Sequence, residues 1–357
     1  MNNKRIITLI YLILSTMIGA GILALPNSLY SIGLISFLFI SLLILLIIYF
    51  SSLILLKSSL KCYKTGLIEV FERYLGKNVG KLSFIIIFFS IIFVCIIYLN
   101  IINFSLKYFV QESEIYTLFI SSITMSASLG GIKLVEKSNE FLFTIKILII
   151  IFFLLLAVCI PKKYSLKCFE FNLTKIFNSI LVLVFSFSFY TIIPSLLYIT
   201  KNERILKTSI IYSILIGFFI YFIFSYIVSL RSGDREISTL GYNELFNFLT
   251  IFLVVTPYLT LSWVLGENIN EKLKIKKRVS ILISYSLPYI LFIFLPKSFL
   301  MYIEITSAFF ILTIYFLIGL IGYKYSQKLK VNRLYSLFLI IFSWILILFK
   351  FLDLIII

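Results

Sequence analysis

MIGAGILALP, residues 17–26, interrupts the first long apolar segment of the chain. In a helix interior a glycine costs about 1 kcal/mol and a proline about 3 kcal/mol relative to alanine, so Gly19, Gly21 and Pro26 weaken the helix here. Within a bilayer, an interrupted backbone is tolerated where it is buried in protein or lines a wet cavity. Two interpretations follow. The break presents free N–H and C=O groups to a solute, or its small residues let another helix approach closely.

The composition is that of a membrane protein, with 61% hydrophobic and 13% charged residues, whereas soluble domains carry about 25% charged residues. The first apolar run, Ile6–Leu25, follows Lys4 and Arg5 but is longer than the core of a signal peptide, so we expect it to be retained. The net charge of +17 does not indicate nucleic acid, because the basic residues lie between apolar segments. No cofactor or metal is predicted, since histidine is absent and the four cysteines are scattered.

Runs of about 17–25 apolar residues, the length that crosses a bilayer, predict an all-α protein with eleven membrane spans. The spans fall at about 6–28, 33–56, 82–106, 115–131, 139–160, 177–198, 207–230, 247–266, 279–296, 299–323 and 334–355. With the N-terminus in the cytoplasm, about two thirds of the 32 Lys and Arg residues lie in inner loops, and 162–175 is a basic exception outside. The positive-inside rule therefore predicts a multi-pass protein of the cytoplasmic membrane, with its C-terminus outside.

Two further features concern the ends of the spans. Residues 65–81 have the pattern of a short amphipathic helix at the inner surface, with Leu67, Ile68, Phe71 and Leu75 on one face. On the last span, Lys350 and Asp353 are three residues apart, which predicts a local ion pair. Glu304, near the outer end of the tenth span, has two interpretations: part of an outer gate, or solvation at the membrane interface.

The sixth span contains a second break, VFSFSFYTIIPS at residues 184–195, with Ser186 and Ser188 at its centre and Pro194 beyond them. Spans 1 and 6 correspond if the chain is an inverted repeat of five helices plus five. Interrupted helices at matching positions of two halves indicate a binding site near the membrane midplane. We therefore predict one transporter domain, 1–357, with repeats at about 6–160 and 177–323 and an extra helix at about 334–355.

Both breaks resemble known motifs. Met17–Pro26 resembles the IGAGILALP signature of the amino acid/auxin permeases and the bacterial aromatic and hydroxy amino acid permeases, and residues 185–196 resemble their sixth-helix FxFHxxxPSL pattern. The resemblance covers nearly the whole chain and implies the LeuT-like fold of the amino acid–polyamine–organocation superfamily. The histidine of the sixth-helix pattern is replaced by Tyr190 or Phe189 here, so its role is not carried over.

A free amino acid brings a carboxylate and an ammonium group to such a site. The half-helix after Gly19-Ala20-Gly21 would direct its N–H groups and positive dipole end at the carboxylate, and carbonyls of both breaks would hold the ammonium. Phe187 or Phe189 would either close over the substrate or pack in the interior, and Tyr98 would reach it from the third span. The predicted substrate-binding residues are Met17, Ile18, Gly19, Ala20, Gly21, Ile22, Tyr98, Ser186, Phe187, Ser188 and Phe189.

Lys146 lies inside the fifth span, where an ionisable residue is a functional candidate. An ammonium group in a low-dielectric interior loses its proton readily, so Lys146 would cycle between charged and neutral forms. The resemblance implies the same role, because a lysine of the fifth helix in proton-coupled relatives lies where sodium-coupled relatives bind an ion. The alternative is that Lys146 snorkels to the inner interface. A competing sodium site would use carbonyls of the first break and eighth-span hydroxyls, here Thr256, Thr260 or Ser262, which would otherwise bond carbonyls near Pro257.

The function predicted first is import of amino acids by proton symport. Two alternatives remain: a sodium-coupled symporter, and a permease-like amino acid sensor of the type found as the membrane subunit of spore germinant receptors. The chain has no residue constellation of an enzyme and no nucleotide-binding loop. Its expected partners are an amino acid, a coupling ion and the lipid bilayer, and the sequence leaves the particular amino acid and the oligomeric state open.

Overall fold

The computed structural model describes residues 2–62, 66–159, 164–197, 199–232, 244–295 and 299–356, which are almost entirely helical. The first half contains α1 (Asn2–Met17), α2 (Gly21–Ile32), α3 (Leu34–Lys61), α4 (Leu67–Leu75), α5 (Lys77–Lys107), α6 (Ser113–Leu129) and α7 (Ile132–Cys159). The second half contains α8 (Leu173–Phe187), a 3-10 turn η1 (Tyr190–Ile192), α9 (Ile193–Leu196), α10 (Glu203–Ser232), α11 (Glu244–Leu273), α12 (Lys277–Phe294), α13 (Phe299–Ile305), a π-helical segment η3 (Thr306–Ile311), α14 (Leu312–Lys324), α15 (Ser326–Leu329) and α16 (Arg333–Ile356).

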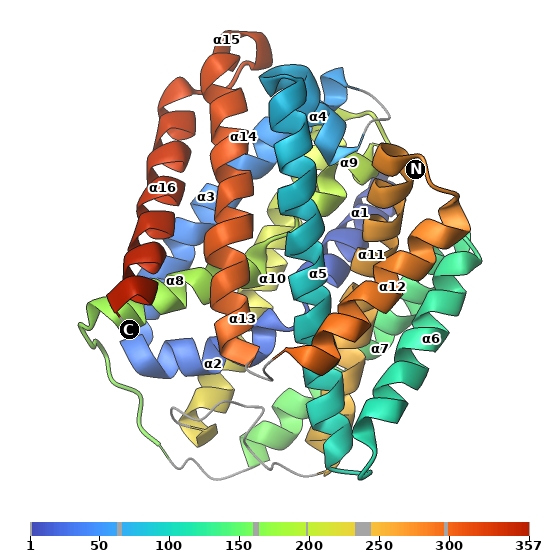
Figure 1. The fold of residues 1–357 in the computed structure, drawn as a ribbon. Coiled ribbons are helices and arrows are strands. Elements are labelled where there is room, and N and C mark those ends of the chain that lie inside the picture. The colour runs from blue at the N-terminus through green and yellow to red at the C-terminus, as the bar shows by residue number, and fades with distance from the viewer. Residues whose placement is uncertain are drawn as a thin grey trace.

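Eight helical stretches within the described ranges are long and apolar enough to cross a membrane, and the bent pair α1–α2 brings the number to nine. α6 and α7 coincide with the fourth and fifth predicted spans but are not among these nine, so the count of eleven stays a prediction. The long helices run side by side, and the N-terminus and the end of α16 lie on opposite sides of the bundle (Figure 1). The chain is a multi-pass helical membrane protein.

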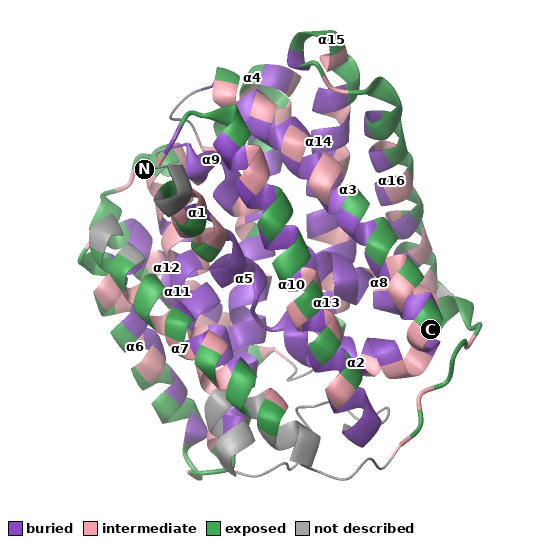
Figure 2. Cartoon of the chain, turned by 180° about the vertical axis from the view of Figure 1, so that it is seen from behind, coloured by how far each residue is buried: buried purple, intermediate pink, exposed green. Residues whose placement is uncertain are grey.

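The outer surface of the bundle is apolar. Large hydrophobic side chains such as Phe39 and Phe294 are 78% and 80% exposed, while the faces turned inward are buried (Figure 2). A water-soluble protein rarely carries so much contiguous apolar surface. Such faces suit contact with lipid hydrocarbon chains, whereas the serine and threonine hydroxyls are mostly buried between helices, where many bond a carbonyl one turn earlier.

The first break divides one span into α1 and α2, which meet at an angle of 66°. Both glycines of the break are also points of close packing. A Cβ atom on Gly19 would lie 2.9 Å from the Tyr98 hydroxyl, and one on Gly21 would lie 2.6 Å from the Cα of Ser186. The close approach of a second backbone at the small residues is therefore confirmed, whereas the presentation of free N–H and C=O groups to a solute stays a prediction.

The second break begins where α8 ends at Phe187. Ser188 is extended, with φ −74° and ψ 122°, and the chain then re-enters helical structure through η1 and α9, with Pro194 in the first turn of α9. Proline is tolerated at that position because the first N–H groups of a helix lack an intrahelical partner. Since Gly21 contacts Ser186, the two breaks lie against each other in the interior of the bundle.

The last helix, α16, packs along α14 at two glycines. A Cβ atom on Gly319 would lie 2.8 Å from Ile340, and Gly322 faces Ser336. Near the C-terminal end of α16, Lys350 Nζ lies 2.9 Å from Asp353 Oδ2, which confirms the predicted local pair. The same Nζ lies 2.7 Å from Glu304 Oε2, so Glu304 belongs to this cluster and ties α13 to α16.

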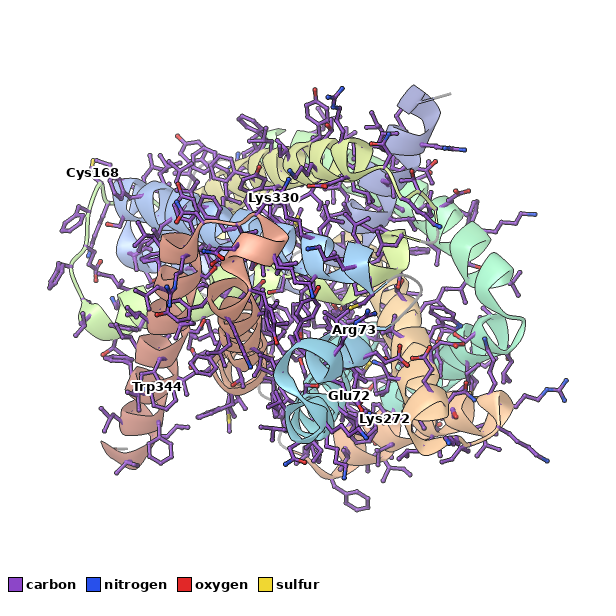
Figure 3. All side chains as sticks on the ribbon, turned by 90° about the horizontal axis from the view of Figure 1, so that it is seen from above. Glu72, Arg73, Cys168, Lys272, Lys330 and Trp344 are labelled. Carbon is purple, nitrogen blue, oxygen red and sulfur yellow. The ribbon has the colours of Figure 1, made fainter. Side chains whose placement is uncertain are left out.

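The amphipathic helix predicted in 65–81 is confirmed as α4, which ends at Leu75 before α5 begins at Lys77. Leu67, Ile68 and Phe71 are buried as expected. An ion pair between Glu72 Oε2 and Lys272 Nζ, 2.5 Å apart, joins α4 to the end of α11 (Figure 3). The hydrogen bond from Lys272 lowers the pKa of the Glu72 carboxyl below its ordinary value, so the pair is ionised at neutral pH.

Candidate substrate site

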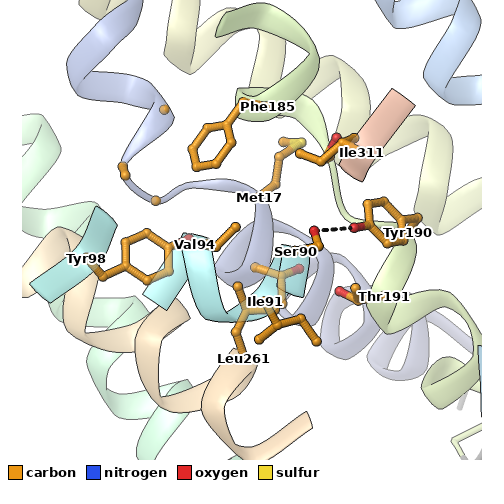
Figure 4. Close-up of a pocket in the computed structure, with 15 residues that line it drawn as sticks. Met17, Ser90, Ile91, Val94, Tyr98, Phe185, Tyr190, Thr191, Leu261 and Ile311 are labelled. Atoms are coloured by element: carbon orange, nitrogen blue, oxygen red, sulfur yellow. Dashed lines mark hydrogen bonds between the residues drawn. The ribbon is translucent and has the colours of Figure 1, made fainter. Parts of the chain in front are cut away.

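A cavity of about 50 Å³ lies where the two breaks meet α5 (Figure 4). This volume holds roughly four water molecules, so the walls must move to admit a whole amino acid. The residues that line it are Thr16, Met17, Gly19, Ala20, Gly21, Ser90, Ile91, Val94, Tyr98, Phe185, Ser188, Tyr190, Thr191, Leu261 and Ile311. They come from both breaks, from α5 and α11, and from the last residue of the π-helical segment η3, a kind of element frequent at functional sites.

The cavity has two polar ends and an apolar middle. At one end Tyr98 and the backbone of the first break meet, because the Tyr98 hydroxyl lies against Gly19. At the other end the hydroxyls of Ser90 and Tyr190 are 3.2 Å apart, with Thr191 beside them (Figure 4). Apolar side chains from several helices form the walls between: Met17, Ile91, Val94, Phe185, Leu261 and Ile311. A ligand with polar groups at both ends and an apolar centre fits this pattern.

Lys146 of α7 lies behind the first break. Its side chain is fully buried, its Nζ donates to the carbonyl of Ile18 at 2.6 Å, and the carbonyl of Ser15 is 3.5 Å away. The side-chain nitrogen therefore contacts backbone that the break has released from α-helical pairing. It does not line the cavity, so a change in its charge would reach the cavity through the first break.

Tyr221 of α10 is a contact that the sequence did not indicate. Its hydroxyl donates to the carbonyl of Met17 at 2.5 Å and lies 2.9 Å from the carbonyl of Ser186. Nothing in the seventh predicted span distinguishes this tyrosine from the other 22 in the chain. Its contacts depend on the packing of α10 against both breaks, which no local pattern in the sequence encodes.

The structure brings about half of the predicted substrate residues to the cavity. Those that line it are Met17, Gly19, Ala20, Gly21, Tyr98 and Ser188, and those that do not are Ile18, Ile22, Ser186, Phe187 and Phe189. Phe187 is 1% exposed and packs edge-on against Tyr221, with ring centroids 5.0 Å apart. Phe189 is 2% exposed. Both phenylalanines thus pack in the interior in this conformation, and the gating role stays a prediction.

The three hydroxyls proposed for sodium do not point to one place. Thr260 Oγ1 donates to the carbonyl of Thr256 at 3.0 Å, as threonines in helices often do, and Ser262 Oγ lies 3.4 Å from the sulfur of Cys95. Thr256 Oγ1 is buried and has no hydrogen-bond partner among the described residues. Ser262 is directed toward α5, so the three hydroxyls do not converge on one position that could hold an ion.

The sequence also missed residues that line the cavity. Phe185, Tyr190 and Thr191 belong to the quoted sixth-span motif but were not selected, and Thr16 directly precedes the first break. Ser90 and Ile311 had no signal, because a serine in α5 and an isoleucine in the tenth predicted span look like ordinary packing residues. Tyr190 is one of the two residues at the motif position for which the resemblance implies a histidine, and its hydroxyl lies 3.2 Å from that of Ser90.

Two interrupted helices that meet at a cavity inside a polytopic membrane protein define a class of protein that handles a solute within the bilayer. The family model of the tryptophan/tyrosine permease family matches residues 2–233, a range that includes both breaks, and the chain belongs to this family. No curated protein matches the chain at a significant level. Membership in a family of amino acid permeases indicates a membrane transporter of amino acids and not an enzyme.

Proposed function

We propose that the chain imports amino acids across the cytoplasmic membrane by proton symport. The observation that carries this proposal is the fully buried Lys146, whose Nζ lies 2.6 Å from the carbonyl of Ile18 in the first break. A lysine that gains or loses its proton there changes the charge beside the break. Protonation and the conformation of the substrate site are thereby coupled through one hydrogen bond.

The proton fits this position better than sodium does. A charged ammonium group already occupies the Ile18 carbonyl, and a second cation at the break would be repelled in a low-dielectric interior. One proton moving down a potential of 100 mV supplies about 2.3 kcal/mol, which corresponds to roughly fifty-fold accumulation. That is sufficient for a nutrient importer.

Within the cavity, we infer that the amino and carboxyl groups of the substrate meet the first break, where α2 begins at Gly21 and the Tyr98 hydroxyl is near. The side chain then extends along the apolar walls toward Ser90 and Tyr190. A phenol hydroxyl or an indole N–H would find a hydrogen-bonding partner there. The family name, tryptophan/tyrosine permease, agrees with such a substrate.

The same proposal includes the architecture and orientation. Eleven spans in a five-plus-five LeuT-like inverted repeat would make the two breaks equivalent, with the last helix added to the repeats. The N-terminus would lie in the cytoplasm and the C-terminus outside. The contact between Gly21 and Ser186 supports the pairing of the two breaks on which the repeat is based.

The test uses purified full-length protein in sealed vesicles with an imposed pH gradient, a labelled amino acid, and Lys146→Ala compared with Lys137→Ala. Lys137 is an exposed lysine on the same helix and serves as the matched control. We expect wild type and Lys137→Ala to accumulate substrate when the outside is acidic, and Lys146→Ala to bind it without accumulation. If Lys146→Ala accumulates substrate with an unchanged pH dependence, proton coupling through this lysine is wrong.

Two further results would select the alternatives. Binding of labelled amino acids without any uptake by wild type would favour the sensor. Uptake that requires sodium and ignores the pH gradient would favour the sodium symporter. A thermal-shift screen against the twenty amino acids identifies the substrate for these assays, because a ligand that binds the folded state raises its apparent stability.

A further inference from the structure

The two breaks are joined by a side chain that belongs to neither of them. The Tyr221 hydroxyl oxygen lies 2.5 Å from the carbonyl oxygen of Met17 and 2.9 Å from that of Ser186. The side chain is 1% exposed and does not line the cavity. One phenol group on α10 therefore links the end of α1 to the end of α8 from outside the substrate cavity.

These two carbonyls lie at the C-terminal ends of half-helices, since α1 ends at Met17 and α8 at Phe187. The last four carbonyls of a helix lack intrahelical donors, and a buried carbonyl without a donor is costly. A tyrosine hydroxyl has a single proton. The two breaks thus share one donor, and the position of each carbonyl depends on the position of the other.

The surroundings of Tyr221 fix it at this junction. Gly217, one turn earlier on α10, leaves room for the Met17 side chain, which a Cβ atom there would overlap. The ring of Phe187 packs edge-on against the Tyr221 ring. Gly21 brings the two backbones together on the first break. The ring therefore lies between both breaks. Its contact with Phe187 orients the hydroxyl toward the carbonyls of Met17 and Ser186.

We propose that Tyr221 is a positioning residue of the transport site, which sets the separation and register of the two breaks so that one amino acid contacts both. This inference rests on the proposed function, because it requires the breaks to bind substrate. The hydroxyl acts through the carbonyls of Met17 and Ser186 and does not itself touch the substrate. Without the hydroxyl, the two breaks lose their shared hydrogen-bond donor. Part of the free energy of substrate binding must then be used to hold the breaks in place, so the affinity for the substrate falls.

The experiment compares Tyr221→Phe with Tyr285→Phe in the full-length protein, with L-tyrosine and L-tryptophan as probes. Tyr285 is a matched control, because it is also a buried tyrosine and its hydroxyl lies 2.7 Å from Ser128, away from the cavity. We expect Tyr221→Phe to raise KM and the Kd from thermal shift by about tenfold, the loss of one well-placed hydrogen bond, with the maximal uptake rate within about twofold of wild type. Tyr285→Phe should leave both constants unchanged.

Thermal unfolding without substrate measures the structural cost of each substitution, and we expect a similar decrease in Tm for both. If Tyr221→Phe decreases Tm or the maximal rate but leaves KM and Kd at wild-type values, the hydroxyl is merely structural and the inference is overturned. If wild type itself neither binds nor takes up any of the twenty amino acids, the proposed function fails, and Tyr221 has no site to position. The two failures are told apart by the wild-type measurement alone.

Discussion

Replacing Gly21 with alanine is expected to push the two breaks apart and to disable transport. The added Cβ atom would lie 2.6 Å from the Cα of Ser186, whereas ordinary contacts begin at 3.4 Å. The backbone at residue 21 or the backbone at Ser186 must therefore move by about 0.8 Å. A backbone segment cannot rotate away as a flexible side chain can. Displacements of about 1 Å at a site that needs accurate placement cost roughly a hundredfold in rate, and we expect a loss of that size in the uptake rate divided by KM.

The assay is uptake of labelled L-tyrosine into proteoliposomes, with Gly130→Ala as the control. Gly130 caps α6 with helical dihedral angles, and the nearest atom to its added Cβ is the end of the Leu134 side chain, which can rotate. This variant should transport normally. If Gly21→Ala transports L-tyrosine with a KM within twofold of wild type, the breaks are not in contact during transport and the proposed site is wrong.

Three other predictions concern the cavity, the charge cluster around Lys350 and the loop that precedes α8. Tyr190→Phe, which leaves Ser90 without its partner, should reduce the preference for L-tyrosine over L-phenylalanine by about tenfold in competition assays. Lys350→Met should lower the free energy of unfolding by about 2 kcal/mol, measured by denaturation in detergent, because it leaves two carboxylates facing each other without a cation. Glu170 should titrate near pH 2 by carboxyl NMR, because hydrogen bonds from Lys167 and Lys175 lower its pKa to about 2.

Each of these has a control and a contradicting result. Tyr258→Phe removes a hydroxyl bonded to Ser121, away from the cavity, and should keep the preference that Tyr190→Phe loses. Lys328→Met removes an exposed lysine and should leave stability unchanged; equal effects of the two lysine variants would exclude a role for the cluster. Because the Glu170 pKa is depressed, its ion pairs contribute above about pH 4.5 and are lost as the pH falls toward 2. A midpoint near 4.5 would mean that they do not form in solution.

The breaks could be predicted because they violate helix propensity. Glycines and prolines inside apolar spans are costly in any membrane helix, so Gly19, Gly21 and Pro194 indicated irregular backbone without knowledge of the fold. The local pair of Lys350 with Asp353 was likewise visible, since three residues along a helix bring two side chains together. The ion pair of Glu304 with Lys350 could not be predicted in this way, because 46 residues separate the two in the sequence.

The cavity lining was less accessible to prediction. Ser90, Ile311 and Tyr221 become significant only through helices packed from distant parts of the chain, and each has an ordinary residue type for its span. For Phe187 the sequence suggested a role that this conformation does not show. An aromatic residue inside a break suggests a gate, but Phe187 packs against Tyr221. Periodicity and propensity describe single helices, whereas a site between helices depends on their relative rotation.

The contact between Glu304 and Lys350 has a consequence for biosynthesis. The carboxylate lies in α13, and its cation follows 46 residues later, on the last helix. Because synthesis runs from the N-terminus, α13 is made before the lysine that pairs with it. Until α16 is in place, the Glu304 carboxylate lacks this cation. The partner of Glu304 is therefore supplied by one of the last parts of the chain to be made, so this ion pair can form only when α16 packs against the bundle.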